Sequence, residues 1–263
     1  MTKKQSLLLL FAFVLSLSSN AQKIQPLFNG KNLSNWDLFI GTALKGFDEL
    51  KKDATPEKTY SIVEQDGEKL LRISGEVNAA LATKEAYENY HFHLEFKWGE
   101  SVYTSRNSGL LYHSYEPFGA GLGTWMSSIE LQLMHENMGD AYMMGNTYAE
   151  IQVSKDGDNQ LFSEEGRILS FGNEQNGGKI ARKKQDMEKS VGKWNVVDLY
   201  CIGNKSIHVI NGTKVMACEN IGKLVNGQVL GLNKGKIQLQ SEGAELFVRQ
   251  ATIEKINVFP TDL

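Results

Sequence analysis

Short segments of alternating apolar and polar residues, separated by turn dipeptides, are the feature that most restricts how this chain folds. Asn-Gly and Asp-Gly pairs favour the tight turns of β-hairpins. Such pairs begin at residues 29, 66, 156, 176, 211 and 226. Long amphipathic helical patterns are nearly absent, and only residues 44–52 are expected to form a short helix. The pattern predicts an all-β protein, built as an antiparallel sandwich or jelly roll.

The alternating segments give the expected strands. They are residues 69–73, 90–98, 128–133, 195–202, 206–210, 214–218, 236–240 and 251–258. Two polar or Gly- and Pro-containing stretches, residues 155–189 and 114–124, are expected to be long loops, which often form lids or rims. For residues 155–189, a solvated excursion without a role is an equal alternative.

The N-terminus has the pattern of a secretory signal. Lysines at positions 3 and 4 precede an apolar run at residues 7–17, and Ser19-Asn20-Ala21 follows. We expect cleavage after Ala21, so that residues 1–21 are a signal peptide and residues 22–263 form one domain that is periplasmic or secreted from a bacterium. No later run approaches the roughly 18 apolar residues of a membrane-spanning helix.

The charge and the cysteines limit the partners and the chemistry. A net charge of −3 at pH 7 argues against nucleic acid as a partner. The only two cysteines are Cys201 and Cys218. Counting from the turns at 203–204 and 211–212 places Cys201 opposite Ser206 and Cys218 opposite Lys205, two strands apart. That separation is about 10 Å, beyond the roughly 7 Å limit for a disulfide, so we expect free, buried thiols.

Polar side chains are concentrated between residues 106 and 140, in strands that otherwise have a buried pattern. In residues 129–133 the aliphatic residues alternate with Glu130 and Gln132, so one face packs while the other presents a carboxylate and an amide. Arg106, Asn107 and His113 lie just before this strand in the sequence. We therefore expect the functional site here.

Several separated motifs occur in an order that is similar to one family. They are Leu27-Phe28-Asn29-Gly30 with Trp36, Glu95-Phe96-Lys97-Trp98-Gly99, Trp125-Met126 with Ser128, Glu130 and Gln132, Gly139-Asp140, and Gln238-Leu239-Gln240-Ser241-Glu242-Gly243. Together they resemble the DUF1080 family, and the resemblance covers nearly the whole chain after residue 21. It implies a concanavalin A-like jelly-roll sandwich of two antiparallel sheets. It also implies 3-keto-glucoside 1,2-lyase and 3-keto-2-hydroxy-glucal hydratase activity, although members are often labelled glycosyl hydrolases.

The spacing of the acids favours elimination over ordinary glycoside hydrolysis. A glycosidase needs two carboxyl groups about 5 to 9.5 Å apart. Glu130 and Glu136 are separated by about 20 Å in an extended strand, and the amide of Gln132 cannot transfer a proton. A cross-strand partner such as Glu95 or Glu242 keeps the conventional mechanism open.

Elimination needs a base for the C2 proton that a 3-keto group acidifies, a donor that stabilises the enolate, and an acid for the leaving oxygen. We expect His113 to act as base, Glu130 as base or acid, and Arg106 as an oxyanion stabiliser. A structural role for His113 is nearly as well supported. The expected substrate-binding residues are Gln132, Trp125 by stacking on a sugar, Glu95, Lys97, Asn107, Gln240, Glu242 and Arg249. Core packing for Trp125 and ordinary ion pairs for Glu95, Lys97 and Arg249 are the structural alternatives.

No organic cofactor is expected. A divalent metal ion on the ketone is an alternative to a cationic side chain, and His113, Glu130, His135 and Glu136 are its candidate ligands, although no spaced metal motif supports it. The expected partner is a small-molecule carbohydrate, an oxidised glucoside supplied by a sugar oxidoreductase. A conventional glycoside hydrolase and a noncatalytic carbohydrate-binding module remain as alternatives.

Overall fold

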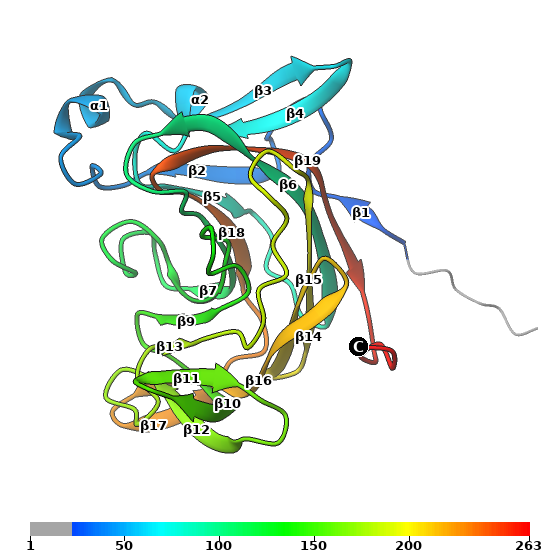
Figure 1. Cartoon of the computed structure of the whole chain (residues 1–263). Coiled ribbons are helices and arrows are strands. Elements are labelled where there is room, and N and C mark those ends of the chain that lie inside the picture. The colour runs from blue at the N-terminus through cyan, green and yellow to red at the C-terminus, as the bar shows by residue number, and fades with distance from the viewer. Residues whose placement is uncertain (1–22) are drawn as a thin grey trace, which may run out of the picture.

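Two antiparallel β-sheets pack face to face in the computed structural model, which describes residues 23–263 (Figure 1). This confirms the predicted all-β sandwich. The expected signal peptide lies outside the described residues. Within residues 23–263, the helices are too short or too polar to pass through a membrane.

The larger sheet has twelve strands and curves along one side of the molecule, from β3 and β4 through β19 and β6 to β10 (Figure 1). Its main order is β11-β10-β16-β15-β14-β6-β19-β4-β3, while β1 pairs with β19, β12 with β10 and β17 with β16. The strands are β1 (Gln25–Pro26), β3 (Tyr60–Gln65), β4 (Glu68–Ile73), β6 (Tyr90–Val102), β10 (Thr147–Asp156), β11 (Asn159–Phe162), β12 (Arg167–Gly172), β14 (Asn195–Ile202), β15 (Lys205–Ile210), β16 (Thr213–Val225), β17 (Gln228–Gly231) and β19 (Ala244–Lys255).

The smaller sheet has seven strands in the order β13-β9-β8-β7-β18-β5-β2. The strands are β2 (Trp36–Ile40), β5 (Ala79–Thr83), β7 (Gly109–Tyr115), β8 (Ser127–Gln132), β9 (Ala141–Met144), β13 (Ile180–Ala181) and β18 (Lys236–Ser241). Two short helices, α1 (Asp48–Asp53) and α2 (Pro56–Thr59), precede β3. The helix expected at residues 44–52 is thus present but begins later, and α2 was not predicted.

The core lies between the sheets because alternate residues of each strand point inward. On β6, Phe92 and Leu94 are fully buried, while the intervening residues are only half-buried. Ile129 and Leu131 on β8 fill the same core from the smaller sheet. Glu130 therefore points to the outer face of the smaller sheet, away from the core.

Three of the β-bulges bear on the predicted site residues and the cysteines. The extra residue lies on β7 between Tyr112 and Tyr115, on β16 at Val215, and on β19 at Arg249. Each extra residue reverses the orientation of the residues that follow it. These bulges determine where several of the predicted site residues lie.

The bulge on β16, at Val215, corrects the register expected for the cysteines. Cys201 lies opposite Ser206, as predicted, but Cys218 also lies opposite Ser206 rather than Lys205. The order of the three strands is nevertheless as expected, and both thiols are free and buried.

Residues 155–189 are not one continuous loop, which corrects the sequence-based interpretation. They contain β11, β12 and β13, which pair with β10 and β9. These short strands lie at the lower end of the sandwich in Figure 1. Their alternation is brief and is interrupted by polar turn residues, which explains why the pattern was missed.

Candidate functional site

The outer face of the smaller sheet brings Glu130 and Gln240 together over Gly109. Gly109 lies on β7, between β8, which carries Glu130, and β18, which carries Gln240. An oxygen of each side chain lies 2.4 Å from the position that a Cβ of residue 109 would occupy. The absence of a side chain at Gly109 therefore makes room for both polar groups at one point of the sheet.

These buried polar groups lack hydrogen-bond partners among the described residues. Glu130 is 4% exposed and Gln240 is 1% exposed. Oε1 of Glu130 and both polar atoms of the Gln240 amide form no hydrogen bond. Buried polar groups in proteins are normally satisfied. Their convergence is therefore the strongest indication of a ligand site on this face.

Asn107 precedes β7 by two residues. The neighbouring Ser108 donates a hydrogen bond of 2.8 Å from its hydroxyl to the carbonyl oxygen of Gln240. The backbone N–H of Leu133 donates to the carbonyl of Ser108 at 3.0 Å, which extends the β7 and β8 pairing beyond the strand ends. Asn107 thus lies between the ends of two site strands, and its buried Oδ1 has no partner.

Glu242 supplies a second carboxyl group just beyond β18. Burial raises the pKa of Glu242 to about 8. Burial, and then the charge of Glu242, raise the pKa of Glu130 well above its usual value. The charges of both acids contribute, after burial, to the raised pKa of Tyr142. Two carboxyl groups that hold protons unusually strongly therefore share this face with a phenol.

The segment between β7 and β8 covers part of the same face. Trp125 is 2% exposed and packs with Leu111, which is the cross-strand partner of Glu130. The indole N–H of Trp125 donates to the carbonyl of Ala79 at 3.1 Å. Trp125 therefore lies at the site, but its ring presents almost no free surface for stacking on a sugar.

Gln238 attaches this segment to the sheet at both ends. Its side-chain N–H donates to the hydroxyl of Ser114 at 2.8 Å, and its side-chain oxygen accepts from the backbone N–H of Met126 at 3.3 Å. Both bonds are buried. Gln238 is therefore a positioning residue for the segment that carries Trp125.

The structure does not bring His113 to this face. His113 lies in the β7 bulge with a left-handed φ of 49°, and its ring packs against those of Tyr90 and Tyr112, which belong to the core. Neither ring nitrogen forms a hydrogen bond, and burial lowers the pKa of His113 to about 4. The position of His113 therefore supports a structural role for this residue rather than the predicted role as a base.

Glu95, Lys97 and Arg249 lie on the outer face of the larger sheet, on the opposite side of the sandwich from Glu130. The Nε of Arg249, at the β19 bulge, donates to Glu95 Oε2 at 2.5 Å. Lys97 lies over the ring of Trp194 at 4.9 Å. These three residues therefore do not share a site with Glu130, contrary to the prediction. Glu95 and Arg249 form an ion pair instead, as the structural alternative proposes.

The remaining predicted residues lie at the end of β8. Gln132 accepts a hydrogen bond from the backbone N–H of Met134. Nδ1 of His135 lies 3.0 Å from Oε2 of Glu188, and the backbone N–H of Glu136 donates to the same oxygen at 2.8 Å. The ring of His135 and the backbone of Glu136 thus contact the carboxylate of Glu188. The carbonyl of Arg106 accepts from the N–H of His135, while the buried Nε of Arg106 has no partner.

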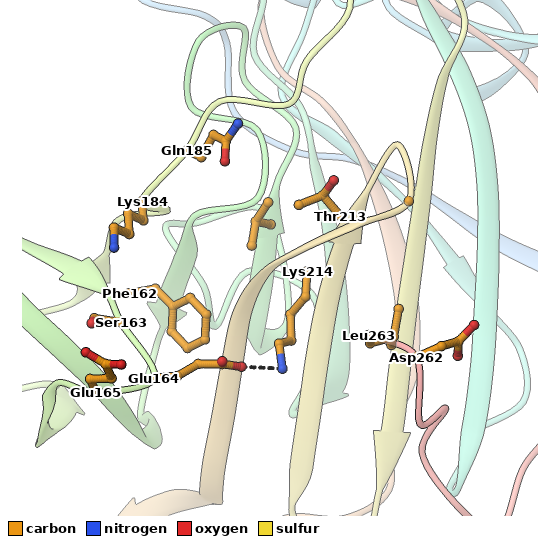
Figure 2. A pocket seen from close by; sticks show the side chains of 12 residues that line it. Phe162, Ser163, Glu164, Glu165, Lys184, Gln185, Thr213, Lys214, Asp262 and Leu263 are labelled. Carbon is orange, nitrogen blue, oxygen red and sulfur yellow. Dashed lines mark ion pairs between the residues drawn. The ribbon is translucent and has the colours of Figure 1, made fainter.

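An open cavity of about 570 Å³ lies elsewhere, between the segment after β11, the turn from β15 to β16 and the C-terminus (Figure 2). An ion pair between Glu164 and Lys214 crosses it. None of the predicted site residues lines this cavity. The volume of this cavity alone does not indicate a reaction, whereas the buried, unpartnered polar groups around Glu130 do.

Sequence reasoning did not identify the roles of Gly109, Gln238 and Tyr142. Gly109 lies in the polar-rich stretch of residues 106–140, and Gln238 begins one of the family motifs. Tyr142 lies opposite Glu130 on β9, in a strand too short to be recognised from alternation. A glycine within a strand indicates close approach by another group, and this signal was available at Gly109.

Solved structures of other proteins are similar to this fold. A candidate glycosyl hydrolase of Parabacteroides distasonis ATCC 8503 has a TM-score of 0.51 and 19% identity, over 89% of this chain and 100% of that chain. A second such protein of that organism gives 0.49 and 18%, over 89% and 94%. The carbohydrate-binding module CBM66 of Bacillus subtilis gives 0.45 and 9%, over 84% and 96%. At these identities the first similarity shows the fold alone, and the other two carry no argument.

Among curated proteins, none is similar enough in sequence to count as a match. The family model of the 3-keto-alpha-glucoside-1,2-lyase-like domain, in contrast, matches residues 23–254. This match spans most of the chain and includes every residue of the site on the smaller sheet. It also confirms the family that the sequence motifs resemble. The chain belongs to the family of 3-keto-alpha-glucoside-1,2-lyase-like domains.

Proposed function

We propose that this protein is a carbohydrate-active enzyme that cleaves 3-keto-glucosides by elimination across C1 and C2, followed by hydration. The net result is hydrolysis of the glycosidic bond. The observation that carries the proposal is the pair of acids on one sheet face, Glu130 and Glu242, whose pKa values are both raised. The family match supports the substrate class.

The proposed elimination needs one acid in its ionised form and the other in its protonated form. In its ionised form, Glu242 would be a stronger base than an ordinary carboxylate because its pKa is about 8, and it would remove the C2 proton. Glu130 retains its proton more strongly than an ordinary glutamic acid and would donate it to the departing C1 oxygen. The reverse assignment uses the same two groups. In either case, each acid completes one proton transfer.

Neutral polar groups around the acids suit an uncharged sugar. The unpaired side-chain N–H of Gln240 is available to the enolate oxygen that develops at C3. Asn107 offers an amide to a ring hydroxyl, and the unpaired Nε–H of Arg106 is a second candidate for the oxyanion. A divalent metal ion on the ketone would serve the same purpose as these donors.

A conventional double displacement would use the same two protonation states. A retaining glycosidase needs one ionised carboxylate as the nucleophile beside a protonated acid. Burial disfavours the ionised acid in both mechanisms, so the family match is what favours elimination. A 3-keto group also acidifies the C2 proton, so that a carboxylate can remove it.

The proposed substrate must come from oxidation of a glucoside at C3, which is the reaction class of a sugar oxidoreductase. The signal pattern at residues 1–21 would direct the enzyme to the periplasm or the medium. We therefore propose that substrate and enzyme meet outside the cytoplasm.

A substrate comparison tests the proposal. The mature chain is incubated with an aryl glucoside and with its 3-keto derivative, and release of the aglycone is measured in deuterated water. We expect release from the keto substrate only, with deuterium at C2 of the recovered sugar. Cleavage of both substrates without deuterium at C2 would indicate a conventional glycoside hydrolase. Binding without turnover of either would indicate a carbohydrate-binding module.

A further inference from the structure

Two histidines and an aspartate meet on the outer face of the larger sheet, on the opposite side of the sandwich from Glu130. His91 and His93 are two residues apart on β6, so both imidazoles leave the same face of the strand. Asp198 on β14 lies opposite His93. Oδ1 of Asp198 is 2.7 Å from Nε2 of His91 and 2.7 Å from Nδ1 of His93. One ligand atom from each of the three residues lies within 4.8 Å of the other two.

The second nitrogen of each imidazole faces another carboxylate. Nδ1 of His91 is 2.8 Å from Oε1 of Glu254 on β19, and Nε2 of His93 is 3.5 Å from Oε1 of Glu95. Histidines that bind metals usually donate their free N–H to such a carboxylate, which fixes the tautomer and the ring direction. Both imidazoles in this cluster have the supporting carboxylate that such a site requires.

The ring of His91 is fixed further by an aromatic neighbour. The ring of Tyr200 stacks on it with centroids 4.3 Å apart and planes 9° apart. The two supports hold Nε2 of His91 towards Asp198. The exposed fractions of the side chains of His91, His93 and Asp198 are 17%, 22% and 14%, so an ion and a water molecule can reach the cluster from solvent.

The charge around the cluster also favours a cation. Three carboxylates, those of Asp198, Glu254 and Glu95, face the two imidazoles. Arg249 neutralises only Glu95, through the ion pair on the side away from His93. A divalent ion between the imidazoles and Asp198 would offset the remaining negative charge.

We propose that His91 Nε2, His93 Nδ1 and Asp198 Oδ1 bind a divalent first-row transition metal ion, with water as the fourth ligand. Two imidazoles and one carboxylate suit Zn²⁺, Co²⁺ or Ni²⁺, whereas Ca²⁺ and Mg²⁺ prefer oxygen ligands. Tetrahedral ligands about 2.0 to 2.1 Å from zinc lie roughly 3.3 Å from one another. The 2.7 Å separations from Asp198 therefore need to open by less than about 1 Å.

The bound ion would connect β6 to β14 at the middle of the larger sheet. Because the core separates this face from Glu130, the site is structural and is independent of the proposed reaction. Binding to the folded state alone raises the midpoint of thermal unfolding. With free metal at about 100 times Kd, we expect a rise of roughly 5 to 10 °C.

Metal titration of the mature chain tests this proposal. After treatment with EDTA and removal of the chelator, Zn²⁺ is titrated by calorimetry and Co²⁺ by the visible absorption of its tetrahedral complexes. We expect one equivalent of either ion to bind. His93→Gln and Asp198→Asn should each weaken binding at least 100-fold, and Glu254→Gln should weaken it about 10- to 100-fold.

His135→Gln is the matched control, because His135 also faces a carboxylate, at 3.0 Å, but without a second histidine. It should bind the ions as the wild type does. Circular dichroism and thermal midpoints measured in EDTA establish that each variant is folded before titration. The absence of stoichiometric binding to folded wild type, or unchanged binding by folded His93→Gln, would overturn the proposal. The cluster would then be a hydrogen-bond network only.

Discussion

The hydroxyl oxygen of Tyr112 lies 3.0 Å from Nε2 of His208, which joins β7 of the smaller sheet to β15 of the larger one inside the core. The same hydroxyl is 2.7 Å from Oγ of Ser206. Nδ1 of His208 donates to the carbonyl of Gly139 at 3.2 Å, so Nε2 is the acceptor for Tyr112. His208 is fully buried. The sandwich therefore has a polar connection at its centre.

Removing this connection should destabilise the fold. Tyr112→Phe leaves His208 and Ser206 without their shared partner, and unsatisfied buried groups cost about 1 to 3 kcal/mol. We expect the free energy of unfolding, measured with urea at pH 7, to fall by that amount. Tyr103→Phe, at a half-buried position, is the control and should change it by less than about 0.5 kcal/mol. Equal effects of the two substitutions would contradict the assigned role of Tyr112.

Two buried histidines should each destabilise the fold between pH 7 and pH 5, in opposition to Glu130 and Glu242, whose raised pKa values favour the folded state as the pH falls. Burial lowers the pKa of both His113 and His208 to about 4, while unfolded histidine titrates near 6.5. The unfolded state therefore takes up protons first as the pH falls. The expected loss is about 2 kcal/mol per histidine over this interval. His113→Asn keeps a residue type that tolerates positive φ. Compared with the wild type in urea unfolding, it should lose about 2 kcal/mol less stability between pH 7 and pH 5. An unchanged dependence would contradict the prediction.

Glu130→Gln should abolish most of the proposed activity while the protein stays folded. The amide is nearly isosteric but cannot transfer a proton, so turnover of a 3-keto-glucoside should fall by about 10²- to 10⁴-fold. Glu219→Gln, at an exposed position on β16, is the control and should retain full turnover. Full turnover by folded Glu130→Gln would show that this carboxyl group does not take part in proton transfer.

The pH dependence of kcat/KM should follow the ionisation of Glu242. If Glu242 is the base, kcat/KM must rise as the pH passes its pKa of about 8, because only the ionised form accepts a proton. We expect this rise in steady-state kinetics between pH 6 and pH 9. In Glu242→Gln, the residual activity should lose it. A rise that persists in the variant would assign the titration to another group.

Gly109→Ala should disrupt the site without a change of charge. The new Cβ would lie 2.4 Å from oxygens of Glu130 and Gln240, so both side chains must shift. A displacement of about 1 Å can cost 10²-fold in rate, and we expect kcat/KM to fall by about that factor. Gly231→Ala, where no atom lies within 4 Å of the added Cβ, should be neutral. Similar kinetics for the two variants would contradict the proposed role of Gly109.

Local alternation was sufficient to predict the strands that lie between clear turns. Residues 195–202 form β14 with the predicted bounds, and Glu130 points away from the core as its alternation with Ile129 and Leu131 indicated. The clustering of polar residues before and within β8 also pointed to the strand that carries Glu130 in the candidate site. These features depend on neighbouring residues, which the sequence displays directly.

Bulges and long-range pairing explain what could not be predicted. The bulge at His113 turns its ring into the core, and the bulge at Arg249 places that residue beside Glu95. Nothing in the residue pattern marks either insertion. Alternation shows that Glu95 and Glu130 each point away from a core, but the choice of sheet depends on pairing between strands far apart in the sequence. β6 and β8 belong to different sheets, so their outer faces are on opposite sides.

The pairing of β1 with β19 means that the chain enters the fold beside the strand by which it leaves. Gln25 is the direct partner of Ile253. A short linker could therefore join the two ends of the domain, and new ends could be opened at the exposed turn around Gly157, where no other group lies within 4 Å of an added Cβ. Such a circular permutant would keep both sheets, and it would carry fusion partners at the far end of β10 instead of beside β19.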